Sequence, residues 1–382
     1  MRTLLITGPG GAGTTTTAAA AAARAARSGQ RVRLLTRQPA PVPGLDAVPG
    51  LEVVVVDAQS AVERLWGTAA DAVGGFLPQV TLPPASSVVP LPGAADLDLF
   101  AELSGSDADL VVVDAGPLES AAVLVALPST LRWWLDQLLP PGVRALGAVR
   151  TATVAAGMAP RGPVDAALDA VPVVEGLLAR NRLADPSTTT VCLVALPRAA
   201  SVPALRSAAT TLGLHGLRAG AVLARVLPVE GRGEWGARRA AEQDDVLARL
   251  AEVAPVHPVA EAAVAPDDVR GLAALLDGFD PPAPSSPAPP APQRQDGAWQ
   301  LAVPLPFAER ADVHLTRWLD DLVVTAGRTR RSLPLDSLLR RCEITGGRLA
   351  DPGSATARLE VGFRPDPQLW PADLLAAERR TP

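Results

Sequence analysis

Short apolar runs alternate with helical patterns through the first 278 residues of this 382-residue chain. Six runs are bounded by turn residues: RTLLIT (2–7), RVRLLT (31–36), LEVVVVD (51–57), ADLVVVD (108–114), TTTVCLVAL (188–196) and LRAGAVLARV (217–226). Their nearly continuous apolar character indicates strands covered on both faces, which requires a parallel sheet with helices on each side. The sequence therefore predicts a doubly wound, mostly parallel α/β domain over residues 1–278.

The segment PPAPSSPAPPAP (281–292) interrupts this alternation. A run so rich in proline cannot pack a core, and it predicts a semi-rigid spacer of about 35 to 40 Å within a linker over 279–297. Beyond it, WQLAVPLPF, DLVVTAG, RTRRSLPL, CEIT and ARLEVGF are short β-type runs separated by turn residues. They predict an all-β sandwich over 298–367, followed by a tail at 368–382.

Composition excludes several classes of protein. The formal charge is −5 and no basic stripe occurs, which argues against a nucleic-acid partner. The first apolar stretch is too short for a signal peptide and none reaches about 18 apolar residues, so we expect a cytoplasmic protein without stable membrane insertion. Cys192 and Cys342 are too few for a disulfide framework or a zinc site, and the three histidines have no ligand spacing.

The segment TGPGGAGTTTT (7–17) has the spacing of a phosphate-binding loop, G-x-x-x-x-G-K-[ST], between a strand and a helix. Gly8, Gly13 and Thr15 keep the register, but Thr14 stands where the lysine belongs, and the chain contains no lysine at all. An ammonium 4 Å from a phosphate charge contributes roughly 4 kcal/mol. Two interpretations stay open: a weakened nucleotide cradle, or a glycine-rich turn that only the fold requires.

Asp114 ends the run DLVVVD, where a second-strand carboxylate of a nucleotide hydrolase contacts magnesium. The hydroxyl of Thr15 is the second candidate magnesium ligand. An aspartate at a strand end is also a common helix cap, so the magnesium prediction depends on the loop spacing as well.

The run STLRWWLDQLL (129–139) predicts a helix that begins after Ser129 and ends before Pro140. Its apolar stripe consists of Leu131, Trp134, Leu135, Leu138 and Leu139, which favours a core face. Trp133 lies off the stripe and is therefore the better candidate for an exposed contact.

Four segments together, GPGGAGTTT, TRQPA, VVVDAGPLESAAVLVALPSTLRWWLDQLLP and VLARVLP, resemble the ArsA and Get-type ATPase family over 1–278. The module after the linker resembles the small heat-shock-protein (α-crystallin-like) domain through LAVPLPF, DDLVVTAGRTRRSLPL and RRCEITGGRL. The resemblance implies a dimeric P-loop NTPase in which ATP and magnesium gate a hydrophobic helical subdomain, here 118–184. Activities of the family include delivery of tail-anchored membrane proteins and support of anion export.

Few of the catalytic and nucleotide-binding residues of that family stand at the matching positions of this chain. Its signature lysine falls at Pro9, its loop lysine at Thr14, and its first-switch aspartate at Gln38. The second-switch motif keeps only Asp114 and Pro117, and the adenine-contacting asparagine falls at Ala224. Arsenite handling is not expected, because about three thiolates would be needed. The candidate nucleotide-binding residues of this chain are Gly8, Gly10, Gly11, Gly13, Thr14, Thr15, Thr16 and Arg225.

Three hypotheses follow. The first is a pseudo-ATPase that binds ATP or ADP weakly and acts as a regulatory subunit, in a homodimer or beside a competent paralogue, holding a hydrophobic client through Trp133 and Trp134. The second keeps ATP hydrolysis, with Arg37, Arg225 or a partner's arginine replacing the lysine. The third is a chaperone-like holdase that works through the sandwich.

Overall fold

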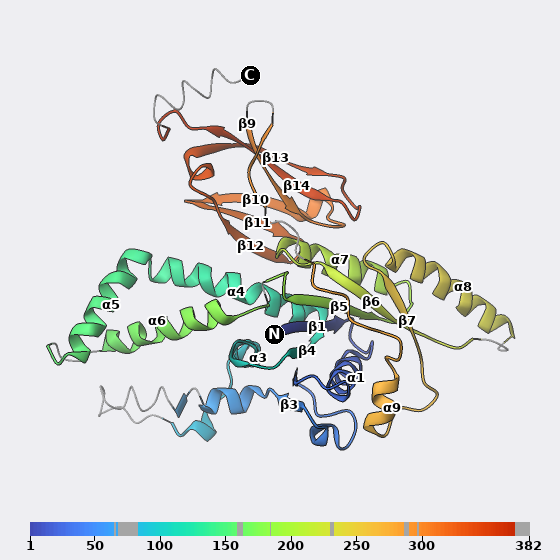
Figure 1. Ribbon diagram of the computed structural model, residues 1–382. Coiled ribbons are helices and arrows are strands. Elements are labelled where there is room, and N and C mark those ends of the chain that lie inside the picture. The colour runs from blue at the N-terminus through green and yellow to red at the C-terminus, as the bar shows by residue number, and fades with distance from the viewer. Residues whose placement is uncertain are drawn as a thin grey trace.

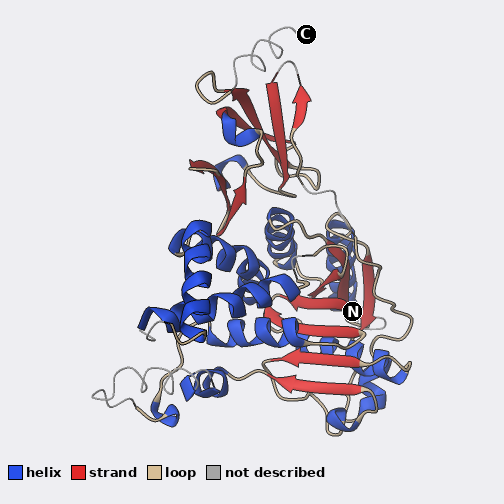
Figure 2. Ribbon diagram, turned by 60° about the vertical axis from the view of Figure 1, so that its left-hand side comes forward, coloured by secondary structure: helices blue, strands red, loops and turns tan. Residues whose placement is uncertain are grey.

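The computed structural model describes residues 1–64, 66–67, 83–158, 163–183, 185–229, 233–285, 290–295 and 298–370. Its main element is a parallel sheet of seven strands (Figures 1 and 2). In sheet order these are β3 (Leu51–Val55), β2 (Val32–Thr36), β4 (Leu110–Pro117), β1 (Arg2–Gly8), β5 (Thr189–Ala195), β6 (Ala219–Val226) and β7 (Val256–Ala260). The predicted doubly wound α/β class is confirmed, and the six predicted runs are strands.

Helices cover both faces of this sheet, which accounts for the nearly continuous apolar runs. On one face Leu4 and Ile6 of β1 contact α1 (Thr14–Arg27) and α9 (Val269–Ala274). On the other face Leu5 joins a core with residues of α3 (Ala94–Gly105), α4 (Leu118–Leu138), α6 (Pro163–Arg180), α7 (Ser201–Leu214) and α8 (Gly233–Leu250).

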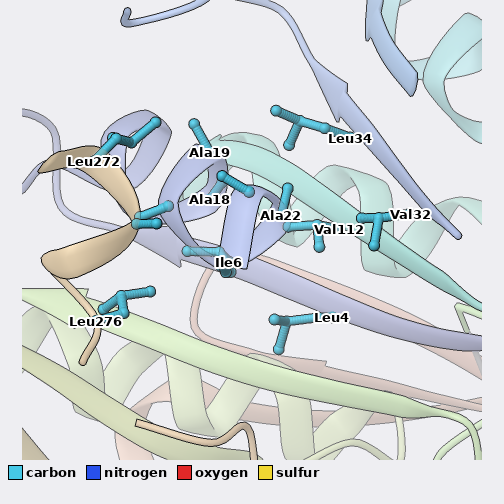
Figure 3. Packing of buried hydrophobic residues seen from close by; sticks show 14 of the residues in the cluster. Leu4, Ile6, Ala18, Ala19, Ala22, Val32, Leu34, Val112, Leu272 and Leu276 are labelled. Atoms are coloured by element: carbon cyan, nitrogen blue, oxygen red, sulfur yellow. The ribbon is translucent and has the colours of Figure 1, made fainter. Parts of the chain in front are cut away.

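Helix α1 packs on the sheet through alanine methyl groups (Figure 3). Ala18, Ala19 and Ala22 are fully buried against β-strand side chains such as Ile6 and Val112. Alanine has the highest helix propensity and the smallest side chain that still buries apolar surface. The helix therefore lies close to the strands, and its first turn is held directly beyond the end of β1.

Helix α4 is longer than the sequence predicts, because it begins at Leu118 and continues through Pro128. The hydroxyl groups of Ser129 and Thr130 donate to the carbonyl of Ala126, at 2.9 and 3.0 Å. Ser129 is thus inside the helix and not its N-cap. With α5 (Pro141–Ala155) and α6 (Pro163–Arg180), α4 forms a helical subdomain that extends beyond the sheet (Figure 1).

The proline-rich segment begins in contact with the α/β domain. The hydroxyl of Thr190 donates to the carbonyl of Pro282 at 3.1 Å, and a Cβ on Gly220 would lie 3.0 Å from the Pro282 ring. The first residues of the predicted spacer therefore lie against β5 and β6. Residues 286–289 and 296–297 are outside the described part of the chain.

The C-terminal module is an antiparallel sandwich, as predicted. One sheet contains β10 (Val313–Trp318), β11 (Asp321–Ala326) and β12 (Thr329–Pro334). The other contains β13 (Cys342–Ala350), β14 (Arg358–Pro365), β9 (Ala298–Pro304) and the short β8 (Gln293–Gln295). Val324, Val361 and Phe363 are fully buried in the core between the two sheets. Residues 371–382 of the predicted tail are not among those described.

The sandwich is docked on α7. Leu214, at the end of that helix, is fully buried in the sandwich core. The Thr210 hydroxyl donates to the carbonyl of Pro306 at 2.5 Å, and the Arg331 guanidinium donates to the carbonyl of Leu214 at 2.7 Å. A Cβ on Gly213 would lie 2.5 Å from the Pro306 ring, so close contact at this point requires glycine. The two domains therefore form a continuous packed unit.

His215 follows Leu214 in this interface and is 6% exposed. Burial, and then the charge of Arg331, lower the pKa of His215 to about 3. Its Nε2 atom has no hydrogen-bond partner among the described residues. The imidazole is therefore neutral in the folded protein, whereas the unfolded chain takes up a proton near pH 6.5.

We expect the docked structure to lose stability in mild acid through this residue. Because the folded pKa lies below the unfolded one, the contribution of His215 is complete above pH 6.5 and is lost as the pH falls from 6.5 towards 3. At pH 5 the free energy of unfolding is lower by about 2 kcal/mol than it is above pH 6.5. Urea unfolding at pH 7.5 and 5.0 measures it, with His215→Gln as the control that cannot titrate. An equal decrease in the free energy of unfolding at pH 5.0 in the native protein and in His215→Gln would contradict the assignment of this loss to His215.

Candidate functional site

The carboxyl ends of the parallel strands lie at one edge of the sheet, where ligands of such folds bind. The predicted loop follows β1 at this edge and leads into α1. Gly11 and Gly13 have φ angles of 79° and 94°, and Gly13 is the N-cap of α1. Only glycine adopts this conformation readily, so the backbone N–H groups are presented at a helix N-terminus, as phosphate binding requires.

Gly8 is fixed by packing as well as by the motif. It is the last residue of β1, and a Cβ there would lie 2.2 Å from the carbonyl oxygen of Val194 on the neighbouring strand. Gly10, by contrast, is exposed, and a Cβ added there would meet open space. The loop therefore contains one glycine that the sheet itself requires, which agrees in part with the turn-only interpretation.

Thr14 is buried at the position of the missing lysine, whereas Thr15 and Thr16 are half-buried. Arg37, one of the two arginines considered as a replacement, forms a salt bridge with Asp96 of α3. That pairing holds the Arg37 guanidinium on α3, so the structure gives no support to Arg37 as the replacement cation.

Arg225 is the arginine that lies beside the loop. Its Nη1 atom is 3.4 Å from the position that a Cβ on Gly13 would occupy. Its Nε atom is 3.3 Å from Oε2 of Glu261, and both side chains are 36% exposed. Arg225 is therefore placed where a phosphate would meet it, but its charge is already balanced by a carboxylate.

Asp114 is 2% exposed at the end of β4. Its Oδ2 accepts a hydrogen bond from the Thr36 hydroxyl at 2.8 Å, and its Oδ1 accepts from the N–H of Gly116 at 3.2 Å. These bonds orient the carboxylate, while each oxygen keeps a lone pair. In the described residues no cluster of three metal-ligating side chains occurs, so the Thr15–Asp114 magnesium site stays a prediction.

Gln38 lies just beyond β2 and is exposed. Its backbone N–H donates to the Thr36 hydroxyl at 3.1 Å, which connects this segment to Asp114 through one shared threonine. The predicted switch residues are thus brought together by Thr36. An amide side chain can orient a water molecule but cannot accept its proton.

The helical subdomain exposes apolar side chains, and one of them is Trp134, which the first hypothesis assigns to client binding together with Trp133. Trp134 and Leu138, assigned to a core face, are 51% and 69% exposed, and Trp133 is the half-buried neighbour. The core-face interpretation is wrong for Trp134 and Leu138, because α4 packs on the sheet mainly through its first half, with residues such as Leu124 and Val125. Beyond Pro128, Leu131 is still partly buried against this core, whereas Trp134 and Leu138 are exposed.

The exposed apolar side chains continue onto the sandwich. Nε1 of Trp318 in β10 donates to the Gln137 amide oxygen of α4 at 3.3 Å, and Trp318 and the following Leu319 are 53% and 71% exposed. We call Trp134, Leu138, Trp318 and Leu319 the apolar surface. In the described part of the chain no helix is long and apolar enough to span a membrane.

Sequence reasoning missed Glu261, Asp96 and Trp318. The first two are partners of arginines far away in the sequence, and no local pattern reveals such pairs. Trp318 lies in β10, whose alternating exposure could have been read from VHLTRW. Cys192 is fully buried, and burial raises the pKa of its thiol to about 12, as expected for a residue without chemistry.

The residues present fit an anion only in part. The glycine backbone of the loop and the guanidinium of Arg225 suit a phosphate, and Asp114 suits a magnesium ion held directly or through water. The lysine ammonium that would neutralise the transferred phosphoryl group has no counterpart, since no lysine exists in the chain. The site thus keeps groups that suit a phosphate and lacks the charge that the family's loop lysine supplies.

Comparisons with known proteins agree with this architecture. The family model for the anion-transporting ATPase matches residues 1–278, and that for the HSP20-like domain found in ArsA matches 296–363. The uncharacterized protein SCO2128 of Streptomyces coelicolor is 37% identical, over 97% of this chain and 99% of its own length. Protein Rv2184c of Mycobacterium tuberculosis is 27% identical, over 90% and 84%. The chain therefore belongs to the anion-transporting ATPase family and carries the HSP20-like domain found in ArsA.

Proposed function

We propose that this chain is a pseudo-ATPase of its family, which binds nucleotide weakly without hydrolysing it and serves as a partner- or client-binding regulatory subunit. The observation that carries the proposal is the buried Thr14 at the position of the catalytic lysine. Both arginines that could replace it are paired with carboxylates, Arg37 with Asp96 and Arg225 with Glu261.

The remaining groups could bind phosphate without accelerating its transfer. Backbone N–H groups of the loop hold a bound phosphate in the ground state, and ATP supplies the phosphoryl group when it is bound. Transfer needs added positive charge as the transition state forms, and a residue that positions the attacking water. In this chain Thr14 offers no charge, and Gln38 offers no base.

The apolar surface supports the partner-binding part of the proposal. Monomeric soluble proteins rarely leave large apolar side chains clustered in water, and such clusters commonly mark contact sites. Trp134 and Leu138 belong to the helix that starts four residues after Asp114, so one helix connects them to the nucleotide site. The proposed occupant is an apolar helical segment, of a client protein or of a partner subunit in a homodimer or heterodimer.

We expect the purified chain to release no more phosphate from magnesium ATP than its Asp114→Ala variant. Thr14→Lys should tighten ADP binding at least about tenfold, because it restores part of the roughly 4 kcal/mol phosphate contact. Phosphate release and calorimetric titration measure the two effects. Saturable hydrolysis that disappears in Asp114→Ala would overturn the proposal in favour of an active ATPase.

We expect the double variant Trp134→Ala/Leu138→Ser of the full chain to bind an apolar helical peptide at least about fivefold more weakly than the native chain does. Fluorescence anisotropy with a labelled synthetic peptide measures this. Trp235→Ala is the matched control, since Trp235 is 55% exposed on α8, outside the apolar surface. Equal affinity for the native chain and the double variant would exclude this surface as the binding site.

A further inference from the structure

A cavity of about 440 Å³ lies at the junction of the two domains, on the face of the sheet opposite to α1. Helices α4 and α7 form two of its walls, and the turn between β11 and β12 of the sandwich forms a third. In the docked structure β11 contacts α7 and β12 contacts α4 (Figure 1). Small-molecule sites are commonly cavities of this size at domain junctions.

The inner surface of this cavity is apolar. Leu193 at the end of β5 is fully buried, and Val125 of α4 and Leu212 of α7 are buried beside it. Both helices also present alanines to the space, such as Ala126 and Ala208. Their small side chains leave room between the helices, so the interior suits an apolar group of a ligand.

The hydroxyl groups of the inner surface are already engaged. The Thr7 hydroxyl donates to the carbonyl of Gly116 at 2.9 Å. The hydroxyl oxygens of Thr211 and Thr329 are 3.2 Å apart and form a hydrogen bond with each other. A ligand inside the cavity therefore gains its affinity mainly from the removal of apolar surface from water.

The charged residues of the cavity are Arg328, Arg330 and Glu119, and all three are exposed. Arg330 donates from Nε to the Thr325 hydroxyl at 2.9 Å, which leaves its two terminal nitrogens for other acceptors. In the described part of the chain neither guanidinium forms an ion pair with a carboxylate, in contrast to Arg37 and Arg225. The opening thus has two guanidinium groups against one carboxylate, an excess of one positive charge.

We infer that this cavity binds a small amphipathic monocarboxylate, with its apolar chain between α4 and α7 and its carboxylate on Arg328 and Arg330. A guanidinium forms charge-assisted hydrogen bonds with a carboxylate, often two at once. The single negative charge of such a ligand balances the excess charge of the opening. The ligand contacts both domains, so it stabilises their docked arrangement, and its binding does not depend on the nucleotide site.

Calorimetric titration of the full chain with sodium octanoate tests this inference. Two probes separate the two parts of the ligand: 1-octanol has the chain without the charge, and sodium acetate has the charge without the chain. We expect saturable binding of octanoate, at least about tenfold tighter than that of either probe, because only octanoate combines apolar burial with a charge-assisted contact. Absence of saturable octanoate binding, or equal affinity for 1-octanol, would overturn the inference.

The variant Arg328→Gln/Arg330→Gln tests the opening. It should weaken octanoate binding about tenfold and leave 1-octanol binding unchanged, because an amide offers hydrogen bonds without the positive charge. The matched control is Arg310→Gln/Arg341→Gln, which removes two exposed arginines of the same domain that do not line the cavity. An equal loss of octanoate affinity in both double variants would assign the effect to net charge and would overturn the inference, as would no loss in the first.

The variant Ala126→Leu tests the interior. The larger side chain occupies space between α4 and α7, so octanoate binding should weaken at least about fivefold. Thermal unfolding without ligand shows whether the variant is folded, and Ala208→Leu on the opposite wall is the alternative if it is not. Unchanged octanoate affinity in a folded variant would place the ligand outside this cavity and contradict the inference.

Discussion

The packing of α1 against the sheet determines the geometry of the candidate site. A helix that packs on the strands mainly through alanine methyl groups, such as those of Ala18 and Ala22, approaches the strands more closely than one with large side chains. Its N-terminus is therefore held beyond β1, and Gly13 must turn with a positive φ to reach it. The loop geometry follows from this packing and does not need the lysine, which explains how the cradle persists after the lysine is lost.

Charge pairing explains why an arginine-rich chain does not simply replace the lost ammonium. The planar guanidinium matches carboxylates and phosphates alike, and both arginines considered as replacements are already paired with carboxylates. Arg37 is held by Asp96, and Arg225 by Glu261. A phosphate would have to compete with or share these partners, which favours weak binding over the concentrated positive charge that phosphoryl transfer requires.

Most of the fold and only part of the site could be predicted from the sequence. Buried strands such as Leu110–Pro117 are recognisable because burial on both faces gives a continuous apolar run, here LVVV, before the site residue Asp114. Strand β7 contains His257 and Pro258 at the sheet edge and lacks that signal. The exposure of Trp134 depends on where α4 leaves the sheet, and the Glu261–Arg225 pair on the alignment of β6 with β7. Both features depend on tertiary packing, which leaves no local pattern in the sequence.

The docking of the sandwich connects these features. It contacts α7 through Leu214 and Arg331, and it meets the far end of α4 through Trp318 and Gln137. Because α4 begins just after Asp114, any displacement of this helix by nucleotide has to move or strain a domain that is packed on its neighbour α7. A domain docked in this way opposes the large motions of an ATP-driven cycle. It is compatible with a subunit whose apolar surface is formed by both domains and is kept in a fixed arrangement.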